Sequence, residues 1–150
     1  MSYFVTGGTG FIGRFLIDRL IAREGTIHVL VRKSSVRKLD ALRPRWGAQA
    51  KRVVAVVGDL AKPRLGIAPA ELAKLKGKID HVFHLAAVYD LSADAQSQEK
   101  ANIDGTRHAV QFAEAVNAGC FHHTSSIAAA GLYEGVFRED MFEEAEELDH

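Results

Sequence analysis

The sequence lacks several features that would assign its 150 residues to a specialised class of protein. Its one cysteine, Cys120, excludes an internal disulfide framework and a cysteine-based zinc cage, and it fits a reducing cytosol. No apolar run approaches the ~18 residues that a membrane span needs. The first residues carry no basic segment and break into glycines too early for a signal peptide. We therefore expect a cytoplasmic protein without an integral membrane segment.

An excess of one charge is also absent, because 19 Lys and Arg balance 19 Asp and Glu. A dedicated nucleic-acid binder is usually strongly basic, so we expect no nucleic-acid partner. The charge is nevertheless uneven: residues 1–75 carry fourteen Lys and Arg against five Asp and Glu, and residues 76–150 carry the reverse. Much of the acid lies in residues 139–149, which we interpret as a solvated helix face or tail.

What is present is the composition of an ordinary globular domain, with hydrophobic segments that alternate with helical patterns. Short apolar runs predict five strands, at residues 3–5, 27–31, 53–57, 79–85 and 120–124. Helical periodicity predicts helices at residues 11–23, 36–46, 71–75 and 98–117. This alternation indicates one α/β domain of the Rossmann type, a doubly wound parallel sheet with strand order 3-2-1-4-5. The continuous apolar run 27–31 is expected to be buried on both faces.

Ligands of such sheets bind at the carboxyl ends of the strands, beside the switch between the first and fourth strands. A glycine-rich segment lies at the first of these ends and runs directly into a helix. Its residues are Thr6, Gly7, Gly8, Thr9, Gly10, Phe11, Ile12 and Gly13. Gly7 permits a tight turn, Gly10 lets the backbone approach a pyrophosphate, and Gly13 lets the helix pack closely on the sheet. The segment predicts a dinucleotide site at the helix N-terminus, against the alternative of a glycine-rich turn without a ligand.

The end of the second strand predicts which dinucleotide is bound. A reader of the ribose 2′-hydroxyl needs Asp or Glu there, but this chain has Arg32, Lys33 and Ser34, with no carboxylate between Thr26 and Leu39. Cations suit a 2′-phosphate, so we predict NADP(H), with an ordinary basic surface loop as the alternative. Asp59, after the third strand, is a candidate acceptor for the adenine amino group, or else it caps its own loop.

Together these residues resemble the extended short-chain dehydrogenase/reductase family. Besides the glycine loop, the motifs that carry this resemblance are Gly58-Asp59-Leu60, His84-Leu85-Ala86-Ala87, Asn102-Ile103-Asp104-Gly105-Thr106 and Thr124-Ser125-Ser126. More narrowly, the chain resembles the N-terminal reductase domain of bacterial alcohol-forming fatty acyl-CoA reductases. The stretches behind that likeness are residues 5–16, 58–60, 79–89, 122–131 and 137–144.

The resemblance implies an NADPH-dependent oxidoreductase that reduces a fatty acyl thioester or a fatty aldehyde toward the alcohol. Leu60, Ala86 and Ala87 are expected in the cofactor site because they follow the third and fourth strands. The resemblance implies that the Ser126 hydroxyl positions the substrate carbonyl, with Ser125 as the alternative. Asn102 either orders the active site through backbone contacts, as its family counterpart does, or is a helix-surface amide.

The family's proton donor, a tyrosine with a lysine four residues later, is missing. Tyr3, Tyr89 and Tyr133 are followed at that distance by Gly7, Ala93 and Phe137. We therefore expect residues 1–150 to be the NADP(H)-binding, N-terminal part of a longer reductase, incomplete at the C-terminal side of its sheet. The rest of the same polypeptide would be its partner, and residues 1–150 alone would be inactive.

Two other functions share the cofactor motifs: a sugar-nucleotide epimerase or dehydratase, and a non-catalytic NADP(H)-binding module. A metal site is not expected, because nicotinamide chemistry needs none. His81 and His84 bracket one predicted strand and His122 and His123 point to opposite faces of another, with no Asp, Glu or Cys partners evident at ligand spacing. We interpret these histidines as structural.

Overall fold

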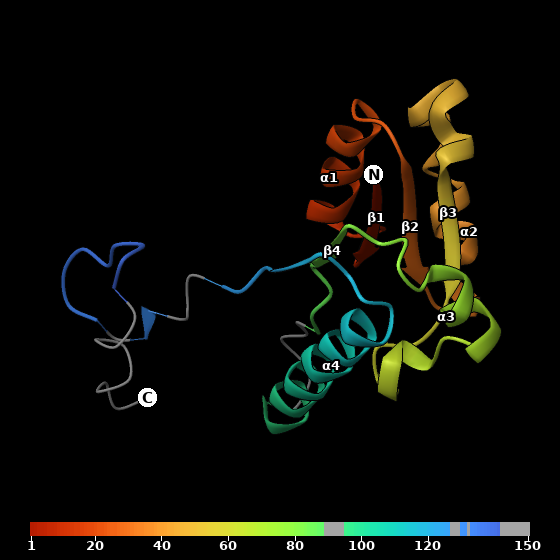
Figure 1. Ribbon diagram of the computed structural model, residues 1–150. Coiled ribbons are helices and arrows are strands. Elements are labelled where there is room, and N and C mark those ends of the chain that lie inside the picture. The colour runs from red at the N-terminus through yellow and green to blue at the C-terminus, as the bar shows by residue number, and fades with distance from the viewer. Residues whose placement is uncertain (89–94, 127–129, 132, 142–150) are drawn as a thin grey trace.

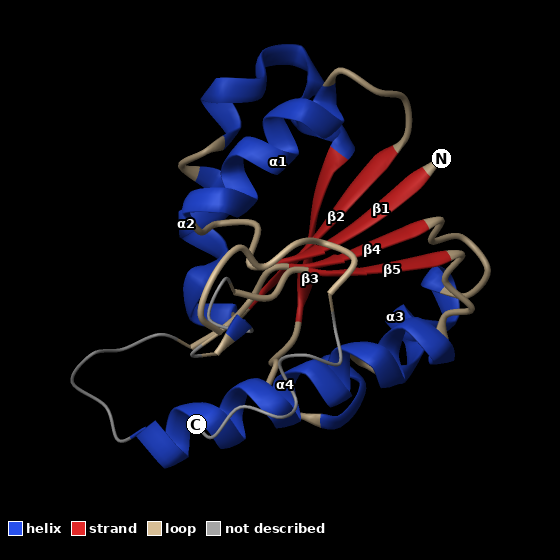
Figure 2. Cartoon of the chain, turned by 90° about the vertical axis from the view of Figure 1, so that its left-hand side faces the viewer, coloured by secondary structure: helices blue, strands red, loops and turns tan. Residues whose placement is uncertain are grey.

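The computed structural model describes residues 1–88, 95–126, 130–131 and 133–141. Within them, five parallel strands form one sheet of order β3-β2-β1-β4-β5, which confirms the predicted order (Figure 2). The strands are β1 (Ser2–Thr6), β2 (Thr26–Val31), β3 (Val53–Val57), β4 (His81–His84) and β5 (Cys120–His123). Because the chain turns from β3 back to β4 on the far side of β1, the switch point lies between β1 and β4, as expected.

Helices cover both faces of the sheet (Figures 1 and 2). On one face lie α1 (Phe11–Ile21) and α2 (Val36–Asp40), and on the other lie α3 (Pro69–Leu75) and α4 (Ala95–Ala115). Three short 3-10 segments complete the connections: η1 (Lys33–Ser35), η2 (Arg43–Arg52) and η3 (Pro63–Gly66). Among the described residues, no helix combines the length and the apolar character needed to cross a bilayer.

Each face has its own hydrophobic core, because successive strand residues point in opposite directions. In β1, Val5 points toward α1 and packs in the cluster that includes Ile17, whereas Phe4 points toward α4. The rings of Phe4 and Phe112 have centroids 4.1 Å apart, and both side chains are fully buried. Phe112 is therefore a core residue.

The prediction that residues 27–31 are buried on both faces is only half right. Ile27, Val29 and Val31 are buried toward α1, but His28 and Leu30 on the other face are only partly covered. The alternation arises because the cluster under α4 is centred on Phe4 and its neighbours in β4 and η3, and Leu30 only borders it.

The predicted single helix over residues 36–46 is wrong. The helix ends at Asp40, and the 3-10 segment η2 follows it. Pro44 cannot donate a backbone hydrogen bond and its ring obstructs the preceding turn, and Gly47 has non-helical angles (φ 49°, ψ −132°). The segment is held instead by α1: the Asp18 carboxylate accepts a 2.8 Å bond from Trp46 Nε1 and pairs with Arg45 at 2.5 Å.

Candidate functional site

The turn from β1 into α1 leaves no room for a side chain at Gly7, Gly8 or Gly13. Gly7 has φ 70°, and a Cβ there would lie 2.9 Å from the backbone nitrogen of Ala86. A Cβ on Gly13 would lie 2.2 Å from the carbonyl oxygen of Gly7, which also accepts the Gly10 N–H at 2.9 Å. Gly10 in turn is the N-cap of α1. The first turn of α1 is thereby packed against the end of β1, with its N-terminus at the carboxyl edge of the sheet.

The other residues of this loop divide into buried and exposed ones. Thr6 is fully buried, and Gly8 is buried with no space for a Cβ, which would lie 2.7 Å from Val29 Cγ1. Phe11 and Ile12, in contrast, are 72% and 59% exposed. Thr6 and Gly8 therefore pack against the interior of the domain. Phe11 and Ile12, in the first turn of α1, leave apolar side chains on the surface.

His84 links three of the sequence motifs through hydrogen bonds. Its Nδ1 lies 2.8 Å from Thr6 Oγ1, and its Nε2 lies 3.3 Å from Thr106 Oγ1. The Thr6 hydroxyl also accepts the Ala86 N–H at 3.2 Å. A neutral imidazole donates from one nitrogen and accepts at the other, and a threonine hydroxyl can take either complementary role. The network joins the ends of β1 and β4 to α4.

Burial keeps the His84 ring neutral. The side chain is 2% exposed, and desolvation, followed by the nearby His123, lowers the pKa of His84 to about 4. His84 is thus a structural residue, as expected of the histidines, and its hydrogen bonds hold the backbone that follows β4.

A groove of about 570 Å³ runs along the carboxyl edge of the sheet, within the roughly 300–1,000 Å³ usual for ligand sites. It brings together the ends of β1, β2, β3 and β4, which is where a ligand is predicted to bind. The predicted site residues among its lining are Gly7, Thr9, Arg32, Asp59, Leu60, Ala86 and Ala87. Lining residues that the sequence motifs did not assign to the site include Ser35, Lys100 and Asp104.

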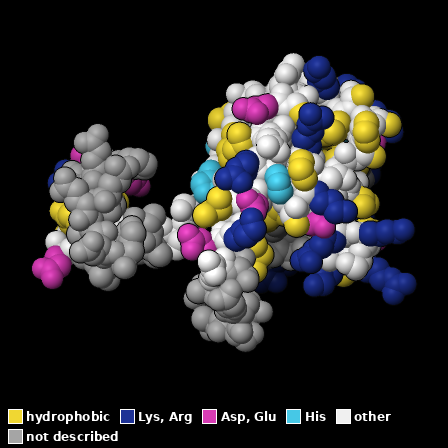
Figure 3. Space-filling model, turned by 90° about the horizontal axis from the view of Figure 1, so that it is seen from below, with side chains coloured by type: hydrophobic (Ala, Val, Ile, Leu, Met, Phe, Trp, Pro, Cys, Tyr) yellow, Lys and Arg dark blue, Asp and Glu magenta, His cyan; other side chains and the backbone are white. Residues whose placement is uncertain are grey.

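A second hollow of about 600 Å³ adjoins the groove and shares Arg32, Gly58 and Asp59 with it. Its lining adds Ser34, as predicted, and also Lys33 and Lys62. No ion pair with a described residue is formed by Arg32, Lys33 or Lys62. Lys and Arg side chains are also numerous on the face shown in Figure 3. Lys62 could have been found from the sequence, because it follows Gly58-Asp59-Leu60 by two residues.

The segment after β3 is anchored to its own turn and to α4. Asp59 Oδ1 accepts the Ala61 N–H at 3.0 Å, so the loop-capping role is present, and a contact with adenine stays a prediction. The Leu60 carbonyl accepts a 2.8 Å bond from His108 Nδ1. Leu60 also packs on Gly105, where a Cβ would lie 2.8 Å from Leu60 Cδ2. The glycine of the helical motif is therefore required by the leucine of the other motif.

Asn102 orders the backbone after β4, the first of the two roles left open for it. Its Oδ1 accepts the Val88 N–H at 2.7 Å, and its Nδ2 donates to the Val88 carbonyl at 3.0 Å. The Asn102 side chain thus bonds both backbone groups of Val88, as a neighbouring strand would. These bonds fix Val88, which lines the groove.

Ser126 is exposed and follows β5 at the carboxyl edge, but it lines neither hollow. Its predicted catalytic role stays a prediction, as does that of Ser125. Several residues named above on sequence grounds lie outside the described residues: Tyr89, Ala93, residues 127–129 and the acidic residues 143–149.

Three side chains that could bind a metal lie closer together than the sequence indicated, and the expectation that the histidines are structural stays a prediction. The structure brings Cys120 to His81 and His122 on one face of the sheet, a set of neighbours that the spacing along the chain had not shown. Parallel pairing is the reason, because it aligns His81 with Cys120 although 39 residues separate them in the sequence. That nicotinamide chemistry in this domain needs no metal stays a prediction.

Comparisons with known proteins show the family of this chain. The family described as Male sterility protein, an NAD-binding family, matches residues 5–150. A subunit of the linear gramicidin synthase of Brevibacillus parabrevis is 34% identical over 91% of this chain and 3% of its own length. The putative fatty acyl-CoA reductase CG8303 of Drosophila melanogaster is 32% identical over 75% of this chain and 23% of its own.

Among solved structures, the terminal R domain from the myxalamid PKS-NRPS biosynthetic pathway superposes with a TM-score of 0.80 and 29% identity. The match covers 93% of this chain and 38% of that one, so the chain spans well under half of the relatives it matches. Their shared fold is the parallel sheet described above. The chain belongs to the Male sterility protein family of nicotinamide-dinucleotide-binding domains, within the extended short-chain dehydrogenases/reductases.

Proposed function

We propose that this chain is the NADP(H)-binding part of a reductase that converts a fatty acyl thioester or a fatty aldehyde to the alcohol. The observation that carries the cofactor choice is the hollow at the end of β2, where Arg32, Lys33 and Lys62 meet without a balancing carboxylate other than Asp59. A ribose 2′-phosphate brings about two negative charges to such a place, whereas a 2′-hydroxyl brings none.

The residues present fit a dinucleotide. Glycines stand where side chains would fill the space between the loop and β4, and the N-terminus of α1 faces the carboxyl edge. In this proposal the phosphates lie against residues 7–13, the 2′-phosphate lies against Arg32 and Ser34, and the chain around Ala86 and Ala87 forms the opposite wall. NADPH, when bound, supplies the hydride.

The substrate class rests on the family and on the relatives, one of which is named as a putative fatty acyl-CoA reductase. Reduction of a thioester consumes one NADPH and one proton, breaks the C–S bond and gives an aldehyde and a thiol. A second NADPH and proton then give the alcohol. Ser126 would donate a hydrogen bond to the carbonyl oxygen and so orient it, while the proton donor would come from the rest of the polypeptide.

The test uses the full-length polypeptide with a long-chain acyl-CoA, the matching aldehyde, and a nucleotide sugar. We expect NADPH to be oxidised with the acyl-CoA and with the aldehyde, and NADPH to be preferred over NADH. The nucleotide sugar should not react. Conversion of the sugar would favour the epimerase or dehydratase alternative. Binding of NADPH without turnover of any substrate would favour the non-catalytic module.

A further inference from the structure

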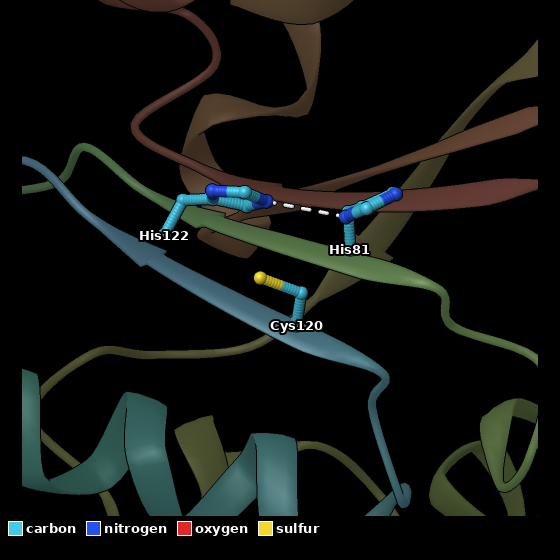
Figure 4. A group of neighbouring side chains, drawn as sticks. All are labelled: His81, Cys120 and His122. Atoms are coloured by element: carbon cyan, nitrogen blue, oxygen red, sulfur yellow. Dashed lines mark hydrogen bonds between the residues drawn. The ribbon is translucent and has the colours of Figure 1, made fainter.

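Away from the groove, three side chains that can bind a metal lie together on β4 and β5. His81 projects from β4, and Cys120 and His122 project from β5, all on the face of the sheet away from α4 (Figure 4). Their ligand atoms all lie within 4.8 Å of one another. Strand pairing places His81 beside Cys120, and the period of two brings His122 to the same face as Cys120.

The spacing of the two imidazoles suits a shared ion. His81 Nδ1 lies 3.1 Å from His122 Nε2. Two nitrogens bound to one tetrahedral zinc at ~2.0–2.1 Å lie about 3.3 Å apart, and a thiolate at ~2.3 Å lies about 3.6 Å from each. The imidazoles therefore need to separate by only ~0.2 Å, and the Cys120 sulfur must come closer by at most ~1.2 Å, which rotation of its side chain supplies.

Neighbouring aromatic rings orient both imidazoles. The Phe83 ring stacks on His122 with centroids 4.4 Å apart and an angle of 10° between the planes. The Tyr3 ring is nearly parallel to the His81 ring, with centroids 6.0 Å apart and an angle of 15° between the planes. Rings fixed in this way lose less side-chain entropy when a ligand binds.

We propose that His81, Cys120 and His122 bind a divalent cation of the zinc type and that the ion fastens β5 to β4. Two imidazoles and a thiolate suit borderline-soft ions such as Zn²⁺ and Co²⁺, not Mg²⁺ or Ca²⁺, which prefer oxygen ligands. Binding breaks the hydrogen bond between His81 Nδ1 and His122 Nε2, and the imidazole that donates it moves its proton to its other ring nitrogen. Two metal–nitrogen bonds and one metal–sulfur bond then form, and the Cys120 thiol releases its proton to solvent. A fourth position is left for a water molecule.

The site is separate from the proposed cofactor groove. His81 and Cys120 are the first residues of their strands, and His122 pairs with Phe83, three residues (~10 Å) before Ala86 at the wall of the groove. In the described part of the chain, β5 is an edge strand that pairs with β4 alone, so a metal bridge between these strands adds a second link to it.

The test uses the full-length polypeptide without a histidine tag, treated with a chelator and a reductant and then titrated with Co²⁺ and Zn²⁺. We expect one Co²⁺ per chain, an intense near-ultraviolet band from thiolate-to-cobalt charge transfer, displacement by Zn²⁺, and release of about one proton. Zn²⁺ should raise the melting temperature by a few degrees.

Variants separate this site from adventitious binding. Cys120→Ser should abolish the charge-transfer band, and His122→Gln and Cys120→Ser should each weaken Zn²⁺ by at least about tenfold. The matched control is His123→Gln, because His123 is the next residue of β5 but lies on the opposite face, beside His84. Absence of the band in the parent protein, or equal Zn²⁺ affinity in Cys120→Ser, would overturn the proposal. Equal losses in His123→Gln and His122→Gln would do so as well.

Discussion

Gly13 has the least space of the residues in the glycine loop, and its contact is with backbone. A Cβ there meets the Gly7 carbonyl at 2.2 Å and the Gly8 Cα at 2.6 Å, and neither atom can rotate away as a side chain could. At Gly10 the nearest atom is the same carbonyl at 3.2 Å, a contact that a small shift relieves. A substitution at Gly13 therefore tests the packing of the helix on the loop, whereas a substitution at Gly10 tests the approach of the loop to a ligand.

We expect Gly13→Ala to lower the free energy of unfolding by about 1–3 kcal/mol, because the helix must move off the loop, and to weaken NADPH binding. Gly10→Ala should cost less stability while still weakening NADPH. Urea denaturation measures the first quantity and calorimetric titration the second. Equal stability of Gly13→Ala and the parent would contradict the packing seen here.

At Arg32 the charge itself is testable. Replacing it by Glu puts a carboxylate where the 2′-phosphate is proposed to lie, so NADPH binding should weaken by about 1–3 kcal/mol, roughly 5- to 150-fold, with little change for NADH. Lys78→Glu is the matched control, since Lys78 is exposed just before β4, at the amino end of the sheet. If NADPH and NADH lose affinity equally in Arg32→Glu, the interpretation of Arg32 fails.

Among the secondary-structure elements, the His84 network fastens β1, β4 and α4 to one another. Its dependence on pH has a definite sign. Since the pKa of His84 falls to about 4 in the folded protein, from 6.5 in an unfolded chain, the unfolded state binds more protons between these values. Stability is therefore full above pH ~6.5 and declines as the pH falls toward 4, by at most about 3 kcal/mol.

This decline is measured by urea denaturation at a series of pH values between 7 and 4. A His84→Asn variant should be less stable at pH 7 and should show a flatter pH dependence over this range. A parent and variant with parallel pH profiles would show that His84 does not titrate as described.

Thr106 tests the helical end of the same network. Thr106→Val removes the hydroxyl that lies 3.3 Å from His84 Nε2 and should cost about 1 kcal/mol of stability. Thr106→Ser keeps the hydroxyl and should retain most of it. Thermal unfolding distinguishes the two, and equal melting temperatures for Val and Ser would contradict a structural role for this hydrogen bond.

For the molecule as a whole, a prediction follows from the proposal that the cofactor site and the proton donor lie in different parts of the polypeptide. If the cofactor site lies in residues 1–150 and the proton donor lies elsewhere in the polypeptide, residues 1–150 alone bind NADPH but do not turn over. Mixing the purified chain with NADPH and an aliphatic aldehyde should quench or shift cofactor fluorescence without steady loss of absorbance at 340 nm. Sustained oxidation by the chain alone would show that its own residues complete the reaction.

The sheet order and the glycine loop could be predicted without coordinates, because both depend on local signals. Apolar runs mark the strands, Gly7 is favoured by its own positive φ, and Gly13 is required by the backbone of Gly7 and Gly8 a few positions earlier. The same local reasoning failed over residues 36–46, where Pro44 and Gly47 outweighed the helical pattern.

Which distant residues meet became known only from the folded chain. Thr6, His84 and Thr106 stood in three separate motifs, and the crossovers brought them into one hydrogen-bonded network. In the same way, the register of β4 and β5 set Cys120 beside His81. Side-chain periodicity predicts which face a residue takes, and the order of elements predicts which strands are neighbours. The register that sets one residue beside another follows from long-range packing of the helices on the sheet, which no short stretch of sequence encodes.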